Sequence, residues 1–238
     1  IQKKIARIRS KDYLNPKFLK VYSKENLPID VIISPEIEIA KSIQRKLEAP
    51  GALDSVPFAN GKVKMLEISV EKNCPIIGIT LKNLTEKFPN FKANILAAVR
   101  EEKFIFLKKD DKILQADKVY LVASSEQLNE ILKAFGHEEK TAEKILIIGG
   151  GNIGLNLAKL VESNSKGARV KIIEKNKVRA EEIANELESS IVINGDGLDE
   201  EILKEAKIEE SETVLALTND DENNIMACVL AEKTAPNK

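Results

Sequence analysis

The sequence predicts an α/β protein with a doubly wound parallel sheet and a second, smaller α+β unit. Three observations predict this fold class. Strand and helix patterns alternate over residues 1–50 and again over 144–238, which is typical of parallel βαβ units. Residues 51–138, between them, change to mostly antiparallel strand patterns. The stretch GGGNIG lies where a strand pattern of the third segment turns into a helix pattern.

The first segment, residues 1–50, reads as two strands joined by a helix and followed by a second helix. Ser34 can cap the second helix, and Pro35 suits its first turn. Apolar residues then repeat at helical spacing from Ile37 to Leu47. We expect strands at 4–9 and 30–34 and helices at 15–26 and 35–48.

The middle segment, residues 51–138, is the expected α+β unit. VKMLEISV alternates as a strand with one covered face, and two later strand patterns flank a Glu-Glu pair like a hairpin. The segment shows no catalytic constellation, and a polar linker follows it. We expect strands at 63–70, 94–100, 103–108 and 118–124 and helices at 81–88 and 125–136.

The last segment, residues 144–238, reads as at least half of a doubly wound sheet, because such a domain usually has about six strands. The expected strands are 145–149, 169–174, 191–194 and 213–217, and the expected helices are 152–163, 176–188, 199–206 and 221–233.

The unfinished sheet needs a partner for its edge. Residues 1–50 are the complementary piece, so we expect the strands at 4–9 and 30–34 to lie parallel to 213–217 in one continuous sheet. This completion can occur in one chain or between two chains. The alternative is that the chain is a fragment; it begins without Met and within a strand pattern.

The glycine-rich turn carries the main functional signal. Gly149 allows a tight turn, Gly151 lets the backbone approach a pyrophosphate, and Gly154 lets the helix pack close to the strand. The helix that begins with Asn152 and Ile153 offers free N–H groups to the phosphates. The pattern therefore predicts a Rossmann-like dinucleotide site. A purely structural glycine turn is the alternative.

An acid at the end of the second strand supports this interpretation. Glu174 ends RVKIIE about 20 residues after Gly154, where such folds place the carboxylate that binds a ribose diol. A carboxylate there repels a 2′-phosphate, which favours NAD or NADH over NADP. Lys175 and Arg179 lie nearby and weaken that preference. A solvated surface acid is the alternative for Glu174.

Two further loops follow strands and complete the predicted site. Asp196, in NGDGLD, can accept a hydrogen bond from an adenine amino group; a helix-start loop with Asp199 as its cap is the alternative. Thr218 and Asn219, in LTNDDENN, can contact the middle of the cofactor or can cap the next helix.

Composition excludes several classes of function. The net charge of −1 creates no field that recruits nucleic acid or an anionic membrane, and aromatic residues are only 4%. The longest uncharged run, Ile145 to Ala158, is shorter than the ~20 residues a bilayer requires, so no membrane insertion is expected. Cys74 and Cys228 match no metal or redox spacing, and we expect a cytosolic protein without a metal.

Several motifs together resemble the regulator-of-potassium-conductance (RCK, or KTN) domain family. They are GGGNIG, VKIIE, GDGLDEEIL and ALTNDDENNI, with IARIRSKDY, IDVIISPEIEIAKSI, CPIIG and DDKILQADKVYLV earlier in the chain. The resemblance implies that residues 1–50 are the second half of an N-lobe with its crossover helix, 51–138 a C-lobe, and 144–238 the first half of a second, NAD-binding N-lobe.

The family also implies a function. Within the family, the chain most resembles the cytosolic nucleotide-binding subunits of Trk-type potassium uptake transporters. The resemblance implies that such subunits bind NAD, NADH or ATP-type nucleotides and thereby change ion transport. The resemblance implies homo-oligomeric rings, a dimer or tetramer, on the cytosolic face of a membrane transporter. It also implies that the helix at 35–48 packs against a second subunit; a helix buried in its own domain is the alternative.

An NAD-dependent oxidoreductase is the competing hypothesis. Such an enzyme needs a proton-transfer group near the nicotinamide. The only histidine, His137, falls in the polar linker, and no substrate domain follows the glycine-rich segment. We therefore expect binding without catalysis and name no catalytic residue.

Overall fold

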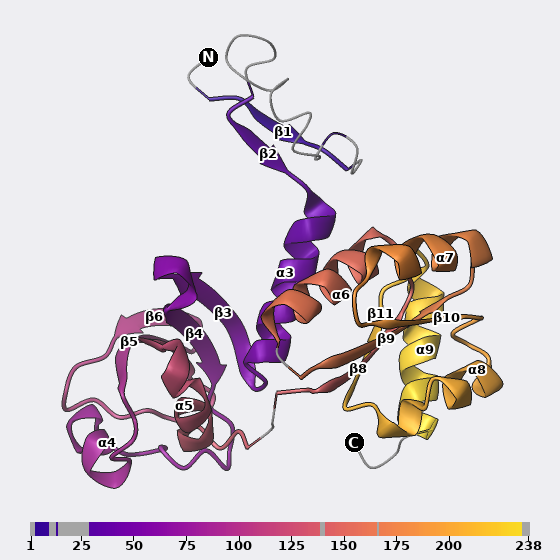
Figure 1. The fold of residues 1–238 in the computed structure, drawn as a ribbon. Helices are drawn as coiled ribbons and strands as arrows, with labels where there is room; N and C mark the ends of the chain where they lie inside the picture. Colours follow the sequence, from indigo (N-terminus) through magenta and orange to yellow (C-terminus); the bar gives the residue numbers. More distant parts are fainter. Residues whose placement is uncertain (1–2, 10–12, 14–28, 139–140, 166, 235–238) are drawn as a thin grey trace. The chain divides into compact units, whose positions relative to one another are not determined.

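The computed structural model describes residues 3–9, 13, 29–138, 141–165 and 167–234 (Figure 1). They form two compact units. Unit 1 comprises Ile1–Gln44 and Ala142–Lys238, and unit 2 comprises Arg45–Thr141. The helix expected at 15–26 lies outside the described residues.

Two short strands begin unit 1. β1 (Ile5–Arg7) and β2 (Val31–Ile33) pair in parallel, as expected for a βαβ connection. They form a two-stranded sheet of their own, so our expectation that they continue the sheet beside 213–217 within one chain is wrong. Each strand has only three residues, and its outward side chains remain uncovered: Ile5 is 62% exposed and Ile33 42%. Completion between two chains stays a prediction.

Helix α3 (Pro35–Glu48) follows β2 directly and confirms the helix expected there. Its acidic first turn, Glu36 and Glu38, and its basic last turn complement the helix dipole. Ala40 and Gln44 are buried, and the Gln44 Nε2 donates a 3.4 Å hydrogen bond to the Leu160 carbonyl in unit 1.

The main sheet of unit 1 is parallel, with the order β10-β9-β8-β11. This is the arrangement of a doubly wound sheet around a central first strand, and it confirms the predicted fold class. Ile145 to Ile148 in the central strand are all buried, as expected for a strand covered on both faces. The strands are β8 (Lys144–Ile148), β9 (Arg169–Glu174), β10 (Ile191–Asn194) and β11 (Thr213–Ala216).

Helices cover both faces of this sheet (Figure 1). Leu146 and Ile148 point to one face, where they pack with residues of α8 and α9. Ile147 points to the other face, beneath Gly154 of α6. All four helices lie close to their expected positions: α6 (Asn152–Asn164), α7 (Lys177–Glu186), α8 (Glu200–Glu205) and α9 (Asp221–Thr234).

Unit 2 is the expected α+β unit. Its five-stranded antiparallel sheet has the order β3-β4-β7-β5-β6, and its apolar core includes Leu66, Leu121 and Phe135. The strands are β3 (Ala52–Phe58), β4 (Val63–Ser69), β5 (Ala93–Arg100), β6 (Lys103–Phe106) and β7 (Lys118–Ser124), and the helices are α4 (Leu81–Lys87) and α5 (Leu128–Ala134).

The sequence did not predict strand β3. Its residues include Asp54, Ser55 and Pro57, which weaken a strand pattern. The structure places β3 at the edge of the sheet, where proline is tolerated because one side of the strand needs no ladder hydrogen bonds.

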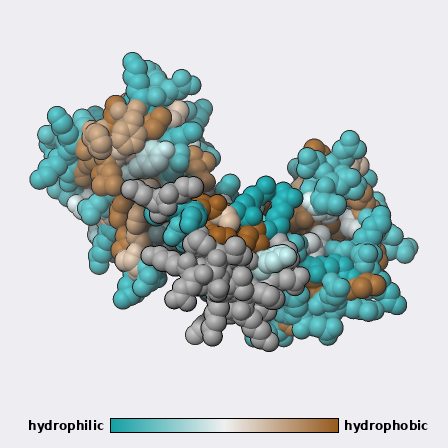
Figure 2. Space-filling view, turned by 90° about the horizontal axis from the view of Figure 1, so that it is seen from above, coloured by the Kyte–Doolittle hydropathy of each residue, from teal (hydrophilic) through white to brown (hydrophobic). Residues whose placement is uncertain are grey.

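Hydrophilic side chains cover most of the face seen in Figure 2, with apolar patches between them.

Candidate nucleotide-binding site

A pocket of about 420 Å³ lies at the carboxyl ends of the four parallel strands of unit 1. Open α/β sheets bind their ligands at this end of the sheet. The ligand lies in the crevice where the order of the strands reverses its direction. The pocket brings together residues from four separate loops, far apart in the sequence. Seven of the predicted site residues line it: Gly149, Gly151, Glu174, Lys175, Asp196, Thr218 and Asn219.

The other three predicted residues, Asn152, Ile153 and Gly154, form the first turn of α6. An added Cβ at Gly154 would collide with the carbonyl oxygen of Gly149, so this glycine lets the helix lie against the end of β8. The role predicted for Gly154, close packing of helix and strand, agrees with that geometry.

Gly149 is required by the fold itself. Its φ of +111° is one that side-chain-bearing residues rarely adopt. An added Cβ would lie 2.9 Å from backbone atoms of Leu217 and Thr218, because the first loop passes close to the loop after β11. The backbone N–H of Gly149 donates a 2.8 Å hydrogen bond to the Ile173 carbonyl.

The fold does not require glycine at position 151. The φ of Gly151 is −64°, which any residue adopts, and an added Cβ would meet no atom within 4 Å. Gly151 is the N-cap of α6 and supplies no side-chain hydrogen bond to the first turn. The start of this helix therefore presents backbone N–H groups and the positive end of the helix dipole beside open space in the pocket.

Glu174 connects the end of β9 to the glycine-rich loop. Its Oε2 accepts a 2.7 Å hydrogen bond from the backbone N–H of Gly150, and its Oε1 accepts a 2.8 Å bond from that of Asn176. An ionised carboxylate has further acceptor positions, so both oxygens keep the capacity to bind another donor. The sequence had identified the acid but not its bond to Gly150.

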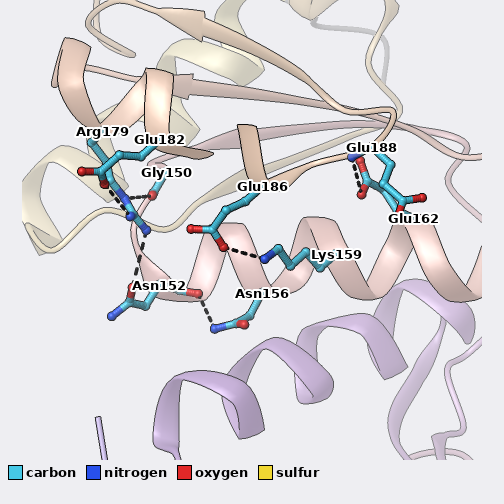
Figure 3. A network of polar contacts seen from close by, with 9 residues as sticks. All are labelled: Gly150, Asn152, Asn156, Lys159, Glu162, Arg179, Glu182, Glu186 and Glu188. Carbon is cyan, nitrogen blue, oxygen red and sulfur yellow. Dashed lines mark hydrogen bonds and ion pairs between the residues drawn. The ribbon is translucent and has the colours of Figure 1, made fainter. Parts of the chain in front are cut away.

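Arg179 in α7 reaches back to the same loop (Figure 3). Its Nε donates a 3.0 Å hydrogen bond to the Gly150 carbonyl, and one terminal nitrogen lies 3.5 Å from Asn152 Oδ1. The other terminal nitrogen pairs with Glu182 at 3.0 Å. The sequence treated Arg179 only as a nearby charge, whereas the structure shows that it holds the glycine-rich loop.

Lys175 and Asp196 form an ion pair at the pocket, with 2.7 Å between Nζ and Oδ2. The Lys175 ammonium, through this hydrogen bond, lowers the pKa of Asp196, and the Leu198 N–H bonded to Oδ1 adds to the effect. Asp196 is therefore a carboxylate at neutral pH. Asp199, by contrast, caps α8 by accepting a bond from the Glu201 N–H, as the alternative interpretation of this loop expected.

The loop after β11 is shaped by Asn224 of α9. The Asn224 Oδ1 accepts bonds from the backbone N–H and the hydroxyl of Thr218, at 2.9 and 2.8 Å, and its Nδ2 donates to the Thr218 carbonyl. Asp220, rather than Thr218 or Asn219, bonds to a backbone N–H in the first turn of α9. The sequence did not identify Asn224; LTNDDENN contains it, but only the fold brings it back onto Thr218.

The described residues contain no group of three or more His, Cys, Asp or Glu side chains able to hold a metal ion. Over the same described residues, no helix has the length and hydropathy to cross a membrane. His137 lies against Gly51 in unit 2, where an added Cβ on that glycine would overlap the imidazole ring.

Two family models match the chain. The TrkA-N domain matches residues 145–238, which contain the pocket, and the TrkA-C domain matches residues 65–136. The chain therefore contains a TrkA-C domain followed by a TrkA-N domain. These two matches agree with the resemblance on which the sequence analysis relied.

Curated relatives agree with this assignment. A "Trk system potassium uptake protein TrkA" of Azorhizobium caulinodans is 43% identical over 97% of this chain, and one of Vibrio alginolyticus is 37% identical over 99%. The chain spans about half the length of these relatives, 50% in both cases.

Solved structures share the fold. The crystal structure of the GsuK RCK domain matches 97% of this chain and 47% of its own, with a TM-score of 0.57 and 18% identity. The GsuK channel bound to NAD matches 98% of this chain and 39% of its own, with a TM-score of 0.58 and 18% identity.

Proposed function

We propose that this chain is a nucleotide-binding part of a regulatory subunit of a Trk-type potassium uptake transporter. The observation that carries the proposal is Gly151, which the fold does not need as glycine but which opens onto the pocket at an uncapped helix start. A glycine in such a position leaves room for a phosphate to approach the backbone.

The residues around the pocket have chemistry that suits NAD or NADH. The backbone of Gly151, Asn152 and Ile153 would bind the pyrophosphate, and Glu174 would accept hydrogen bonds from the ribose hydroxyls. Asp196 would bind the adenine amino group, with Lys175 beside it. Thr218 and Asn219, across the pocket, would contact the middle of the cofactor. ATP or ADP, which share the phosphates and the ribose, are alternative ligands.

Names of similar proteins support the regulatory role. Curated relatives are potassium uptake proteins, and a channel that shares the fold has been solved bound to NAD. We infer a homo-oligomer, a dimer or a tetrameric ring, that docks on a membrane transporter from the cytosolic side without entering the membrane. Neither nucleic acid nor a metal has a role in this proposal.

The same inference extends to the domain organisation. In this account residues 1–50 are the second half of one N-lobe with its crossover helix, and 51–138 are a C-lobe. Residues 144–238 are the first half of the next N-lobe. Nucleotide binding at the last segment would bias two conformations of the assembly and so change ion transport.

Binding without turnover distinguishes this proposal from an oxidoreductase. None of the described residues that line the pocket is a histidine or tyrosine, the side chains that most often exchange a proton beside a nicotinamide. The test is a fluorescence titration with NADH, followed by long incubation with a panel of small carbonyl compounds. Saturable binding with no loss of NADH is expected. Steady NADH consumption, or no binding, would overturn the proposal.

A further inference from the structure

A second cavity of unit 1 lies at the opposite end of the parallel sheet. It measures about 390 Å³ and is formed where β8, β9 and β10 begin, beside the short turn at Ile208–Glu210. The candidate nucleotide-binding site occupies the carboxyl ends of the strands, so the two cavities are separated by the length of the sheet. None of the residues that line one lines the other.

The lining of this second cavity is strongly cationic. Four positive side chains contribute to it, against the single carboxylate of Glu210. The Lys207 Nζ lies 3.1 Å from Glu210 Oε1, and this contact, with weaker help from other lysines of the cavity, lowers the pKa of Glu210. Among the described residues of the lining, positive side chains therefore outnumber carboxylates. The Glu212 carboxylate, which accepts a 3.2 Å hydrogen bond from the backbone N–H of Lys144, lies next to the lining. The four cations are Lys144, Arg169, Lys171 and Lys207.

Hydrogen bonds hold two of these cations in place, those of Lys171 and Lys207. The Lys171 Nζ donates a 2.7 Å hydrogen bond to the carbonyl of Ala206, at the C-terminus of α8, which leaves two further N–H donors on the ammonium. Lys207 has a left-handed backbone with a φ of 55°, an uncommon conformation for a residue with a side chain.

The floor of the cavity is apolar. Ile145 and Val170 are buried beneath it, and Ile191 is 56% exposed at its side. Ser189 and Ser211 complete the lining, and the Ser189 hydroxyl donates a 3.3 Å hydrogen bond to Glu162 Oε1. An apolar floor with a few convergent polar groups, in a volume of a few hundred Å³, is the usual form of a small-molecule site.

We propose that this cavity binds a phosphate-bearing small molecule, such as pyrophosphate or a nucleoside diphosphate, independently of the candidate nucleotide-binding site. Lysine ammonium groups bind phosphate as point charges, and a guanidinium can bind two of its oxygens at once. Such a ligand would neutralise the excess positive charge at the start of the strands. An acidic protein segment is a poorer match, because a volume of about 390 Å³ suits a small molecule.

The test uses calorimetry with inorganic pyrophosphate on the full chain. The titration is carried out on Gly151→Val, in which a side chain blocks the other pocket, so that only the second cavity is available. Saturable binding is expected in this variant. Arg169→Gln or Lys171→Gln, added to it, should weaken binding at least about fivefold, since each removes a phosphate-facing cation. Thermal unfolding checks that each variant remains folded.

Lys204→Gln is the matched control. Lys204 is an exposed lysine of α8 outside the cavity lining, so its loss changes the net charge equally but should leave the affinity unchanged. No binding in the Gly151→Val chain, or equal weakening by Lys204→Gln and Arg169→Gln, would overturn the proposal.

A parallel titration with ADP identifies the source of the phosphate. Tighter binding of ADP than of pyrophosphate would assign the apolar floor to a nucleoside, whereas equal affinity would assign the site to the anion alone. Either result supports a phosphate site, provided that Arg169→Gln weakens both ligands.

Discussion

At the scale of single residues, the glycines of one motif serve different purposes. The fold requires glycine at position 149, because the φ of Gly149 is positive and because a side chain there would crowd the backbone of Leu217 and Thr218. Gly151 is constrained by nothing within the described protein. The sequence assigned both glycines to a nucleotide site, and only the structure separates the glycine that shapes the loop from the one that leaves space.

This difference predicts that alanine lowers the stability of the fold at Gly149 and leaves it nearly unchanged at Gly151. Gly149→Ala should lower the free energy of unfolding by about 1–3 kcal/mol, because it strains the backbone and crowds the neighbouring loop. Gly151→Ala should change it by less than about 0.5 kcal/mol. Urea denaturation of both variants measures the difference, and equal losses would mean that Gly151 is also structural.

Glu174 should decide between NADH and NADPH. Glu174→Gln keeps an acceptor for the Gly150 N–H but removes the charge that strengthens bonds to ribose hydroxyls and repels a 2′-phosphate. We expect NADH affinity to fall about tenfold while NADPH affinity holds or rises. Competition titrations measure both. An equal fall for the two cofactors would contradict the ribose role.

Glu162 makes the stability of unit 1 depend on pH. Burial raises its pKa, but hydrogen bonds from the Ser190 hydroxyl and from the backbone N–H groups of Ser189, Ser190 and Glu188 outweigh this and lower the pKa to about 2. Figure 3 shows the bond from Glu188. Because the folded pKa is depressed, the stabilisation is complete above the ordinary value of 4.5. It is lost as the pH falls from there towards 2.

Glu162→Gln should therefore destabilise the chain by about 1–2 kcal/mol at pH 7, a figure reduced for the solvent that screens a half-buried carboxylate. The difference from the unmodified chain should shrink as the pH falls below 4.5. Urea midpoints at several pH values measure it, with the exposed Glu181→Gln as control. A difference that does not vary with pH would exclude the charge as the cause.

At the scale of elements, local signals predicted most helices and strands. Alternation and apolar runs located β4, β7 and β8, and the serine–proline start located α3. Edge strand β3 was missed because its pattern is interrupted by polar residues and proline. Arg179 and Asn224 were not assigned their contacts, because a periodic pattern does not report which distant backbone group a side chain reaches.

Helix α3 provides a test of assembly. Ile39 is 44% exposed in this chain, and Ile43, one turn later, is only half-buried. We expect this apolar side to pack against a second subunit, so Ile43→Glu should convert dimers to monomers in light scattering. Lys46→Glu, on an exposed position of the same helix, should leave them intact. A dimeric Ile43→Glu chain would contradict the interface.

At the scale of the whole molecule, pattern alone did not determine which strands share a sheet. β1 and β2 have the expected type and mutual direction, but they pair only with each other among the described strands. Periodicity reports the environment of a strand and not its neighbour, so the order of strands had to come from the structure. The roles of the ten site residues remain predictions, although the structure brings seven of them to one pocket.

The central claim is that nucleotide binds where Gly151 leaves space. Calorimetry of NADH with the unmodified chain and with Gly151→Val tests it most directly, because valine at this position meets no protein atom near its Cβ and should leave the fold intact. Thermal unfolding of both chains verifies that. The account predicts saturable binding to the unmodified chain and no measurable binding to the folded variant. Unchanged NADH affinity in Gly151→Val would contradict it.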